Sequence, residues 1–164
     1  MLLYFLFDFP VKLHLPAYPP GVHRIEETLD SKDLDLRPEM FASAIRAHLI
    51  LDRHDPYLQF EFNLGATVRL VCDRCAAPYD HELEVKAPML YVMGRAAPDS
   101  PDDPEIVYLP VGAAEVDITT DLRDFIMLAV PGRRLCSEDC KGLCPSCGAD
   151  LNEQPCACPA FVHR

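Results

Sequence analysis

The stretch LQFEFNLGATVRLVC, residues 58–72, decides how this chain folds. Apolar side chains occupy every second position along it, and they are Leu58, Phe60, Phe62, Leu64, Ala66, Val68, Leu70 and Cys72. A period of two residues is typical of a β-strand with one face toward a core and the other toward water. A strand this long needs partners for its backbone groups, so the stretch predicts a sheet.

The segments on either side alternate in the same way. Apolar residues fall on every second position from Ile45 to Leu51 and again from Leu83 to Tyr91, and the polar break DRHDP, residues 52–56, predicts a turn. Strands joined by short connections pair antiparallel. We therefore predict an antiparallel meander of at least three strands, in which the connection after the central strand carries the motif CDRC, residues 72–75.

Shorter elements are expected around the meander. The start, MLLYFLFDFP, predicts an opening strand and not a signal peptide, because it lacks a basic region. Residues 23–29, 105–109 and 115–118 are strand candidates, whereas the acidic, proline-rich segment 94–104 predicts an exposed loop, ordered or not.

One helix is indicated by TTDLRDFIMLAVPG, residues 119–132, with Thr120 as its cap and Leu122, Phe125 and Ile126 on one face. The fold class is α+β: a mostly antiparallel meander or barrel-like sheet, closed by this helix, with a cysteine-rich zinc-knuckle tail. Residues 1–134 are expected to form the β-rich domain, with its helix near 120–130. Residues 135–164 are expected to form a metal-binding tail packed on it.

The composition narrows the class of function. There are 15 Lys and Arg residues against 26 Asp and Glu, so the formal charge of −11 repels a phosphate backbone. No apolar run approaches the roughly 18 residues of a membrane helix, which predicts a cytoplasmic protein without a membrane partner. No histidine pair, nucleophile elbow or phosphate-binding glycine loop is present, so we expect neither an enzyme nor a small-molecule substrate.

The cysteines carry the clearest chemistry. Six of eight lie in the run LCSEDCKGLCPSCGADLNEQPCAC, residues 135–158, where Cys144-x-x-Cys147-Gly148 is typical of a zinc knuckle. Six thiols are two more than one tetrahedral ion needs, whereas all eight make two closed sites. The preferred sets are Cys72, Cys75, Cys136 and Cys140 for one zinc ion, and Cys144, Cys147, Cys156 and Cys158 for another.

Two other chemistries compete for these thiols. A redox C-x-x-C opens a helix in a βαβ unit, whereas Cys72 and Cys75 lie between two predicted strands. The spacing Cys140-x₃-Cys144-x₂-Cys147 matches the iron–sulfur motif of radical-SAM enzymes, but these need a large barrel after it and only 17 residues follow Cys147.

Four basic residues near the cysteines are candidates for contact with RNA or an acidic partner. They are Arg74, Arg133, Arg134 and Lys141. Two of them, Arg133 and Arg134, also suit the C-terminus of the predicted helix, where positive charge is favourable.

The combination of VCDRCAAPY, residues 71–79, with the cysteine run resembles the YceD family of large ribosomal RNA subunit accumulation proteins. The resemblance covers residues 44–158. It implies a small bacterial protein, with relatives in plant plastids, that acts as a non-enzymatic factor in the accumulation of 23S ribosomal RNA or in large-subunit assembly. The implied partner is a ribosomal protein or an assembly intermediate, with ribosomal RNA as a further candidate, and the acidic charge suits a basic ribosomal protein at least as well as RNA.

The resemblance also leaves alternatives open. It assigns Cys72-Asp73-Arg74-Cys75 to the family at large but the tail cysteines only to some members, so a single tail zinc with a free C-x-x-C is the alternative to two ions. The rival functions are a zinc-ribbon module that binds ribosomal RNA directly through the four basic residues, and a thiol oxidoreductase that uses Cys72 and Cys75.

Overall fold

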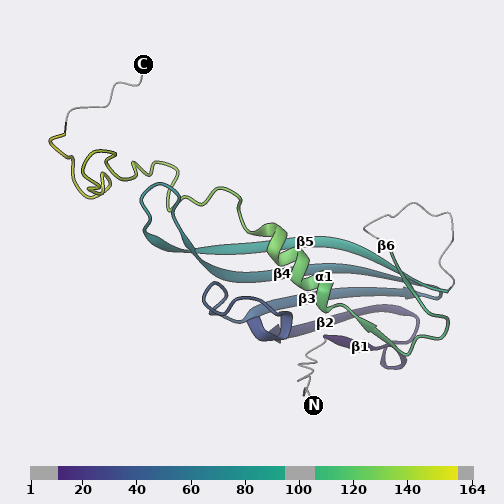
Figure 1. Cartoon of the computed structure of the whole chain (residues 1–164). Helices are drawn as coiled ribbons and strands as arrows, with labels where there is room; N and C mark the ends of the chain where they lie inside the picture. The colour runs from purple at the N-terminus through teal and green to yellow at the C-terminus, as the bar shows by residue number, and fades with distance from the viewer. Residues whose placement is uncertain (1–10, 95–105, 159–164) are drawn as a thin grey trace, which may run out of the picture. The chain divides into compact units, whose positions relative to one another are not determined.

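The computed structural model describes residues 11–94 and 106–158, which belong to two compact units. Residues 1–68 and 82–130 make up the first, the sheet unit, and residues 69–81 and 131–164 make up the second, the cysteine unit. The expected opening strand at residues 1–10 and almost all of the expected loop 94–104 lie outside the described residues. Figure 1 traces the chain through both units.

A five-stranded sheet forms the body of the sheet unit, in the order β2-β3-β4-β5-β6. Its strands are β2 (Gly21–Leu29), β3 (Ile45–His54), β4 (Tyr57–Val71), β5 (Pro78–Met93) and β6 (Ile106–Leu109). The antiparallel pairing of β2 with β3 and of β3 with β4 confirms the predicted meander. β6 instead runs parallel to β5.

The sheet is open, so the expectation of a barrel-like sheet is wrong. Its order leaves β2 and β6 at opposite ends, and closure requires these two strands to pair. The remaining described strands, β1 (Lys12–His14) and β7 (Glu115–Asp117), pair with each other as a separate two-stranded sheet. They therefore do not bridge the two edges.

The turn after β3 is tighter than the polar break predicted. β3 continues to His54 and β4 begins at Tyr57, so only Asp55 and Pro56 remain between the paired strands. The polar side chain of Arg53, near the end of β3, has hydrogen-bond partners: its Nη1 donates to the backbone oxygens of Leu15 and Tyr18, 2.7 and 2.8 Å away.

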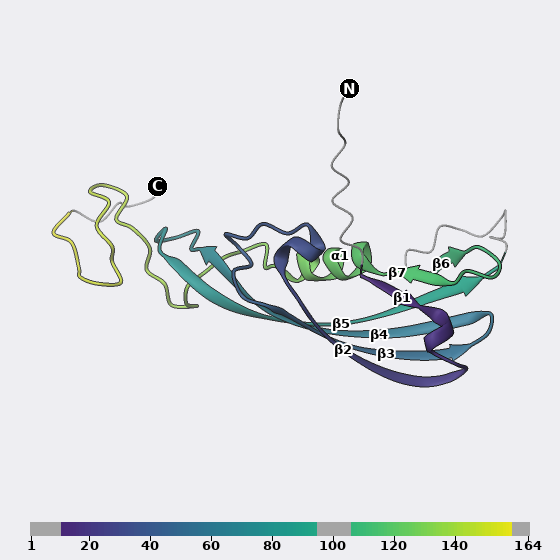
Figure 2. The ribbon, with the colours of Figure 1, turned by 90° about the horizontal axis from the view of Figure 1, so that it is seen from below.

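Helix α1 (Thr119–Ala129) covers one face of the sheet, as Figure 2 shows. Its residues Leu122 and Ile126 are buried, and the ring of Phe125 lies 5.6 Å from that of Phe62 on β4. The expected cap at Thr120 is wrong: the helix begins at Thr119, so its N-cap position is Ile118, and Asp117 Oδ1 accepts a hydrogen bond of 3.0 Å from the Thr119 N–H.

The core of the sheet unit follows the alternation in β4. The inward side chains of β4 that belong to the sheet unit are at most 3% exposed. They are Leu58, Phe60, Phe62, Leu64, Ala66 and Val68. Burying one such Leu or Phe stabilises the fold by about 1.5–3 kcal/mol relative to exposure. Two short 3₁₀ helices, η1 (Leu15–Ala17) and η2 (Ser31–Leu34), each bury a leucine. Among the described helices, none is long and apolar enough to cross a membrane.

Candidate metal centres

All eight cysteines belong to the cysteine unit, and none forms a disulfide. The hairpin tip between β4 and β5 supplies two of them, and the chain after α1 supplies the other six. Cysteines at least 61 positions apart along the chain thus enter one small unit, which a metal ion can organise where the apolar core is small.

The hairpin tip forms a tight turn around Cys72. The N–H of Ala76 donates to the carbonyl of Cys72 and the N–H of Cys72 donates to the carbonyl of Ala77, both over 2.9 Å. Ala76 has a left-handed φ of +56°. This turn directs the Cys72 and Cys75 side chains toward one point, which is what a metal knuckle requires.

The same turn is built a second time in the tail. The N–H of Gly148 donates to the carbonyl of Cys144 over 2.9 Å, and the N–H of Cys144 donates to the carbonyl of Ala149 over 2.8 Å. Here the left-handed position is a glycine, with a φ of +74°. The two C-x-x-C motifs therefore share one backbone geometry, although only the second has the glycine that marks a knuckle in sequence.

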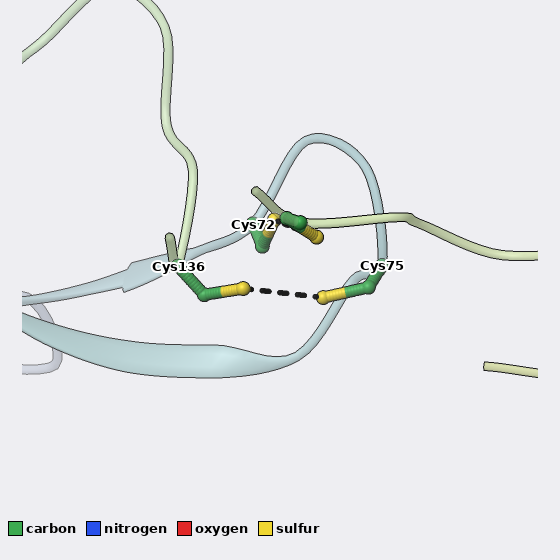
Figure 3. A group of neighbouring side chains, drawn as sticks. Cys72, Cys75 and Cys136 are labelled. Atoms are coloured by element: carbon green, nitrogen blue, oxygen red, sulfur yellow. Dashed lines mark hydrogen bonds between the residues drawn. The ribbon is translucent and has the colours of Figure 1, made fainter. Parts of the chain in front are cut away.

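The first cluster gathers four sulfur atoms within 4.8 Å of one another, those of Cys72, Cys75, Cys136 and Cys140. The Sγ atoms of Cys75 and Cys136 point toward each other across 3.7 Å (Figure 3), and the Sγ atoms of Cys72 and Cys140 are also 3.7 Å apart. A disulfide needs about 2.05 Å. Zinc–sulfur bonds of about 2.3 Å in a tetrahedron place sulfur atoms about 3.8 Å apart. The spacing therefore fits a tetrahedral metal.

Polar contacts hold the tail segment of the first cluster against the hairpin tip. Arg74 Nη1 donates to the backbone oxygen of Cys140 over 2.7 Å. Asp73 and Arg134 exchange two bonds: Asp73 N–H donates to Arg134 O over 2.7 Å, and Arg134 N–H donates to Asp73 Oδ2 over 2.8 Å. The two inner residues of the C-D-R-C motif thus fix the chain on both sides of Cys136.

Hydrogen bonds to sulfur surround the first cluster. The N–H of Arg74 donates to Cys72 Sγ, and the side-chain amide of Asn152 donates to Cys140 Sγ, each over 3.5 Å. Donors of this kind stabilise thiolates and orient metal ligands. Sequence reasoning overlooked Asp73 and Asn152. The position of Asp73 inside the motif was the available signal, whereas nothing in the sequence marked Asn152.

The second cluster consists of Cys144, Cys147, Cys156 and Cys158, whose sulfur atoms also lie within 4.8 Å of one another. Only Cys144 is buried, and Cys147 is exposed. A cavity of about 600 Å³ adjoins the cluster, and its lining includes Cys144, Cys156 and Cys158. The structure thus brings the thiols together in the same two sets of four that the sequence favoured, and each set can hold a metal ion.

One thiol in each cluster is easy to ionise. The backbone N–H of Cys75 makes the largest contribution in lowering the pKa of Cys72 to about 6. The N–H groups of Cys147 and Ser146 likewise lower the pKa of Cys144 to about 6. Each of these two sulfur atoms is therefore ready to bind a cation near neutral pH.

One other thiol in each cluster, that of Cys136 and that of Cys158, resists ionisation in the absence of a cation. The side chain of Cys140 is the main cause that raises the pKa of Cys136 to about 12, and that of Cys147 is the main cause that raises the pKa of Cys158 to about 12. Negative charges packed this closely repel one another, and a divalent cation among them removes that repulsion. The chemistry of both donor sets therefore fits a metal ion.

The four basic residues predicted to contact a partner differ in their surroundings. The side chain of Arg74 is bonded to Cys140, and the backbone of Arg134 is bonded to Asp73. All four residues are exposed, and neither Arg133 nor Lys141 has a described side-chain hydrogen bond. In the described parts of the chain, no further group of three or more His, Cys, Asp or Glu side chains is placed to hold a metal ion.

Comparisons with known proteins place these centres in a family context. Residues 60–161 match the model of a family described as large ribosomal RNA subunit accumulation protein YceD. A chloroplastic protein of Arabidopsis thaliana, named as a YCED homolog, is 36% identical over 32% of this chain, and its counterpart in Zea mays is 40% identical over 32%. An uncharacterized protein of Mycobacterium bovis is 36% identical over 51%.

These matches cover only parts of the relatives. The chain spans 16% and 18% of the length of the two plant proteins and 40% of the mycobacterial one. No solved structure matches the chain. All eight cysteines fall within residues 60–161, so both candidate centres lie in the matched region.

Proposed function

Since this chain belongs to the YceD family of large ribosomal RNA subunit accumulation proteins, we propose that it is a non-enzymatic factor that promotes accumulation of 23S ribosomal RNA or assembly of the large ribosomal subunit in the cytoplasm. The names of the plant relatives support this role. The arrangement of the thiols supports a factor rather than an enzyme, because a closed site of four cysteines leaves no open coordination position for a substrate.

Each cluster holds one structural zinc ion in this proposal. The supporting observation is the sulfur spacing of 3.7 Å in the first cluster, close to the roughly 3.8 Å edge of a tetrahedral zinc–thiolate site. Soft thiolate ligands favour zinc over the harder divalent ions. Zinc supplies about 10–16 kcal/mol to small units of this kind, which compensates for a poor apolar core.

The charge distribution favours a basic ribosomal protein as the partner. Residues 69–81 and 131–164 contain six of the 15 basic and six of the 26 acidic residues, so the sheet unit carries the entire formal charge of −11. A surface of that sign attracts basic proteins and repels RNA. Direct binding of ribosomal RNA instead depends on the cysteine unit, where Arg133 and Lys141 present exposed side chains.

Depletion and rescue in cells test the proposal. In depleted cells we expect fewer large subunits in a sedimentation profile and less large-subunit RNA. The wild type and Ser43→Ala, which keeps every thiol and lies in the sheet unit, are expected to restore both. The variant with Cys72→Ser and Cys75→Ser is expected to fail. An unchanged profile after depletion contradicts the proposed function, whereas full rescue by the double variant contradicts the need for the first metal centre.

A further inference from the structure

The two cysteine clusters differ in the contacts, other than sulfur–metal bonds, that hold their four thiols in place. From this difference we infer that the second cluster is an exchangeable metal site, which loses and regains its ion while the first cluster stays loaded. The inference rests on the proposed function in one respect: both clusters must bind a soft divalent ion such as Zn²⁺.

The first cluster is held by contacts that do not involve a metal. Arg74 Nη1 is bonded to the oxygen of Cys140, and Asp73 is bonded twice to the backbone of Arg134. The N–H of Leu143 also donates to the oxygen of Arg74 over 3.2 Å. When the ion leaves, these bonds keep the thiols near one another, so the ion is quickly recaptured.

Burial also protects the first cluster. Cys72, Cys75 and Cys140 are only 2%, 6% and 2% exposed, and Ala77, Tyr79 and Leu135 pack against them. The fourth thiol, that of Cys136, is exposed, whereas in the second cluster only Cys144 is buried. Metal exchange between thiolate sites proceeds by attack of an incoming ligand, which requires access. A competing ligand therefore reaches an ion in the first cluster slowly.

The second cluster has one ordered arm and one arm that depends on the metal. The turn from Cys144 to Ala149 has its own backbone hydrogen bonds. Along the described tail, however, these bonds end with the one from Gln154 N–H to Asp150 O, at 3.3 Å. The arm that carries Cys156 and Cys158 thus has no described backbone–backbone hydrogen bond to the rest of the unit, and its sulfur–metal bonds must hold it there.

The second cluster is also accessible. Cys147 is exposed, and the adjoining cavity of about 600 Å³ is lined by Cys144, Cys156 and Cys158 together with the apolar side chains of Pro145 and Leu151. Ligand pockets for small molecules have volumes of about 300–1,000 Å³, so a low-molecular-weight thiol or chelator fits beside the sulfur atoms. Such a ligand can attack the ion directly.

The protein therefore has a one-ion form and a two-ion form, which differ in the order of residues 156–158. The exchanging species is a soft divalent cation, and the ligands that compete for it bear thiolate or imidazole groups. Because the released arm belongs to the unit with the exposed basic side chains of Arg133 and Lys141, metal supply would regulate the surface that this unit offers a partner.

Kinetics of zinc release test the inference. The full chain, loaded with two Zn²⁺ ions, is mixed with the chromophoric chelator 4-(2-pyridylazo)resorcinol, and released zinc is followed by absorbance. We expect two phases of one ion each, with rates at least about tenfold apart, because contacts that support metal ligands typically change metal affinity by about 10- to 100-fold. The variant with Cys156→Ser and Cys158→Ser should lose the fast phase and keep the slow one, whereas Ser43→Ala, at an exposed position in the sheet unit, should keep both.

Thiol labelling of the wild type assigns the phases without relying on a variant that folds. After the fast phase, N-ethylmaleimide and peptide mass spectrometry should locate label on Cys144, Cys147, Cys156 and Cys158, with the other four cysteines protected. Release of both ions in one phase, or early label on Cys72 and Cys75, overturns the inference. A purified chain that binds no zinc at all contradicts the metal part of the proposed function instead.

Discussion

The guanidinium group of Arg74 donates a hydrogen bond from Nη1 to the backbone oxygen of Cys140, 2.7 Å away. The backbone of Arg74 adds a donor to Cys72 Sγ at 3.5 Å and an acceptor for the N–H of Leu143 at 3.2 Å. Arg74 therefore joins the hairpin tip to the tail on both sides of the first cluster. The arginine of the C-D-R-C motif thus has a structural task that needs no partner molecule.

Replacement of Arg74 should weaken metal binding. Arg74→Ala removes the bond to Cys140, so we expect the affinity of the first cluster for zinc to fall by about 10- to 100-fold. Arg74→Lys keeps the charge but not the planar fork, and should lie between wild type and Arg74→Ala. Competition titration with a chelator measures the affinity. Arg133→Ala is the matched control, because in the described residues its side chain has no hydrogen-bond partner.

The same variants separate the structural task from contact with a partner. If Arg74 acts by holding Cys140, zinc affinity and large-subunit RNA levels fall together in Arg74→Ala. Normal zinc affinity combined with a loss of large-subunit RNA would show instead that Arg74 meets a partner directly.

Two glycines of the tail offer a matched comparison of steric crowding. Gly142 and Gly148 have φ angles of +75° and +74°, so an alanine at either has the same conformational cost of about 1–2 kcal/mol. A Cβ at Gly142 would lie 3.0 Å from the backbone oxygen of Arg74, whereas one at Gly148 meets nothing within 4 Å. We expect Gly142→Ala to destabilise the zinc-loaded protein by about 1–3 kcal/mol more than Gly148→Ala. Equal midpoints in urea unfolding would show that the hairpin tip and Gly142 are not in contact.

The C-x-x-C turn at the hairpin tip has a strained backbone at Ala76, which a glycine would relieve. Its φ of +56° is unfavourable for a residue with a Cβ, and the corresponding position in the tail knuckle is Gly148. Ala76→Gly should therefore raise the free energy of unfolding by up to about 1 kcal/mol, the gain being reduced by the greater freedom of glycine in the unfolded chain. Ala77→Gly, next to it, should instead lower the free energy by about 0.5–1 kcal/mol. Urea unfolding of both variants checks the pair, and destabilisation by Ala76→Gly would contradict the prediction.

The sequence predicted those elements whose pattern is local. The alternation in β4 and the apolar face of α1 are properties of single segments, and both elements form as expected. The pairing of β1 with β7 and the parallel addition of β6 to β5 depend on where distant segments meet. Such short strands carry too few residues for periodicity to specify their partners.

The candidate site likewise combines features that a local sequence pattern predicts with features that depend on contacts between distant segments. Cysteine spacing alone indicated metal chemistry, because few other uses require so many thiols in a short run. The supporting roles of Arg74 and Asn152 depend on contacts over 66 and 12 residues of sequence, which no spacing rule encodes. The basic charge of Arg74 suggested contact with RNA or an acidic partner, whereas the structure shows its guanidinium bonded to the backbone of Cys140.

A buried tyrosine makes the stability of the sheet unit depend on pH. The hydroxyl of Tyr91 donates to Asp121 Oδ2 at the start of α1. Burial raises the pKa of Asp121 above its usual value, and the bond from Tyr91 opposes that shift. A carboxyl group that holds its proton more tightly in the folded chain stabilises the fold most fully below its unfolded pKa, about 3.9. That contribution is lost as the pH rises through the folded pKa.

Removal of the tyrosine hydroxyl should therefore cost more at neutral than at acidic pH. Tyr91→Phe leaves the half-buried carboxylate of Asp121 without this donor, so we expect a loss of about 1–3 kcal/mol in the free energy of unfolding at pH 7. Near pH 4 the loss should be smaller, because the variant raises the pKa of Asp121 further and more of the carboxyl is neutral. Urea unfolding at both pH values measures the difference, with Tyr57→Phe as the control, since Tyr57 is exposed. An equal loss at the two pH values would mean that the charge of Asp121 plays no part in the bond.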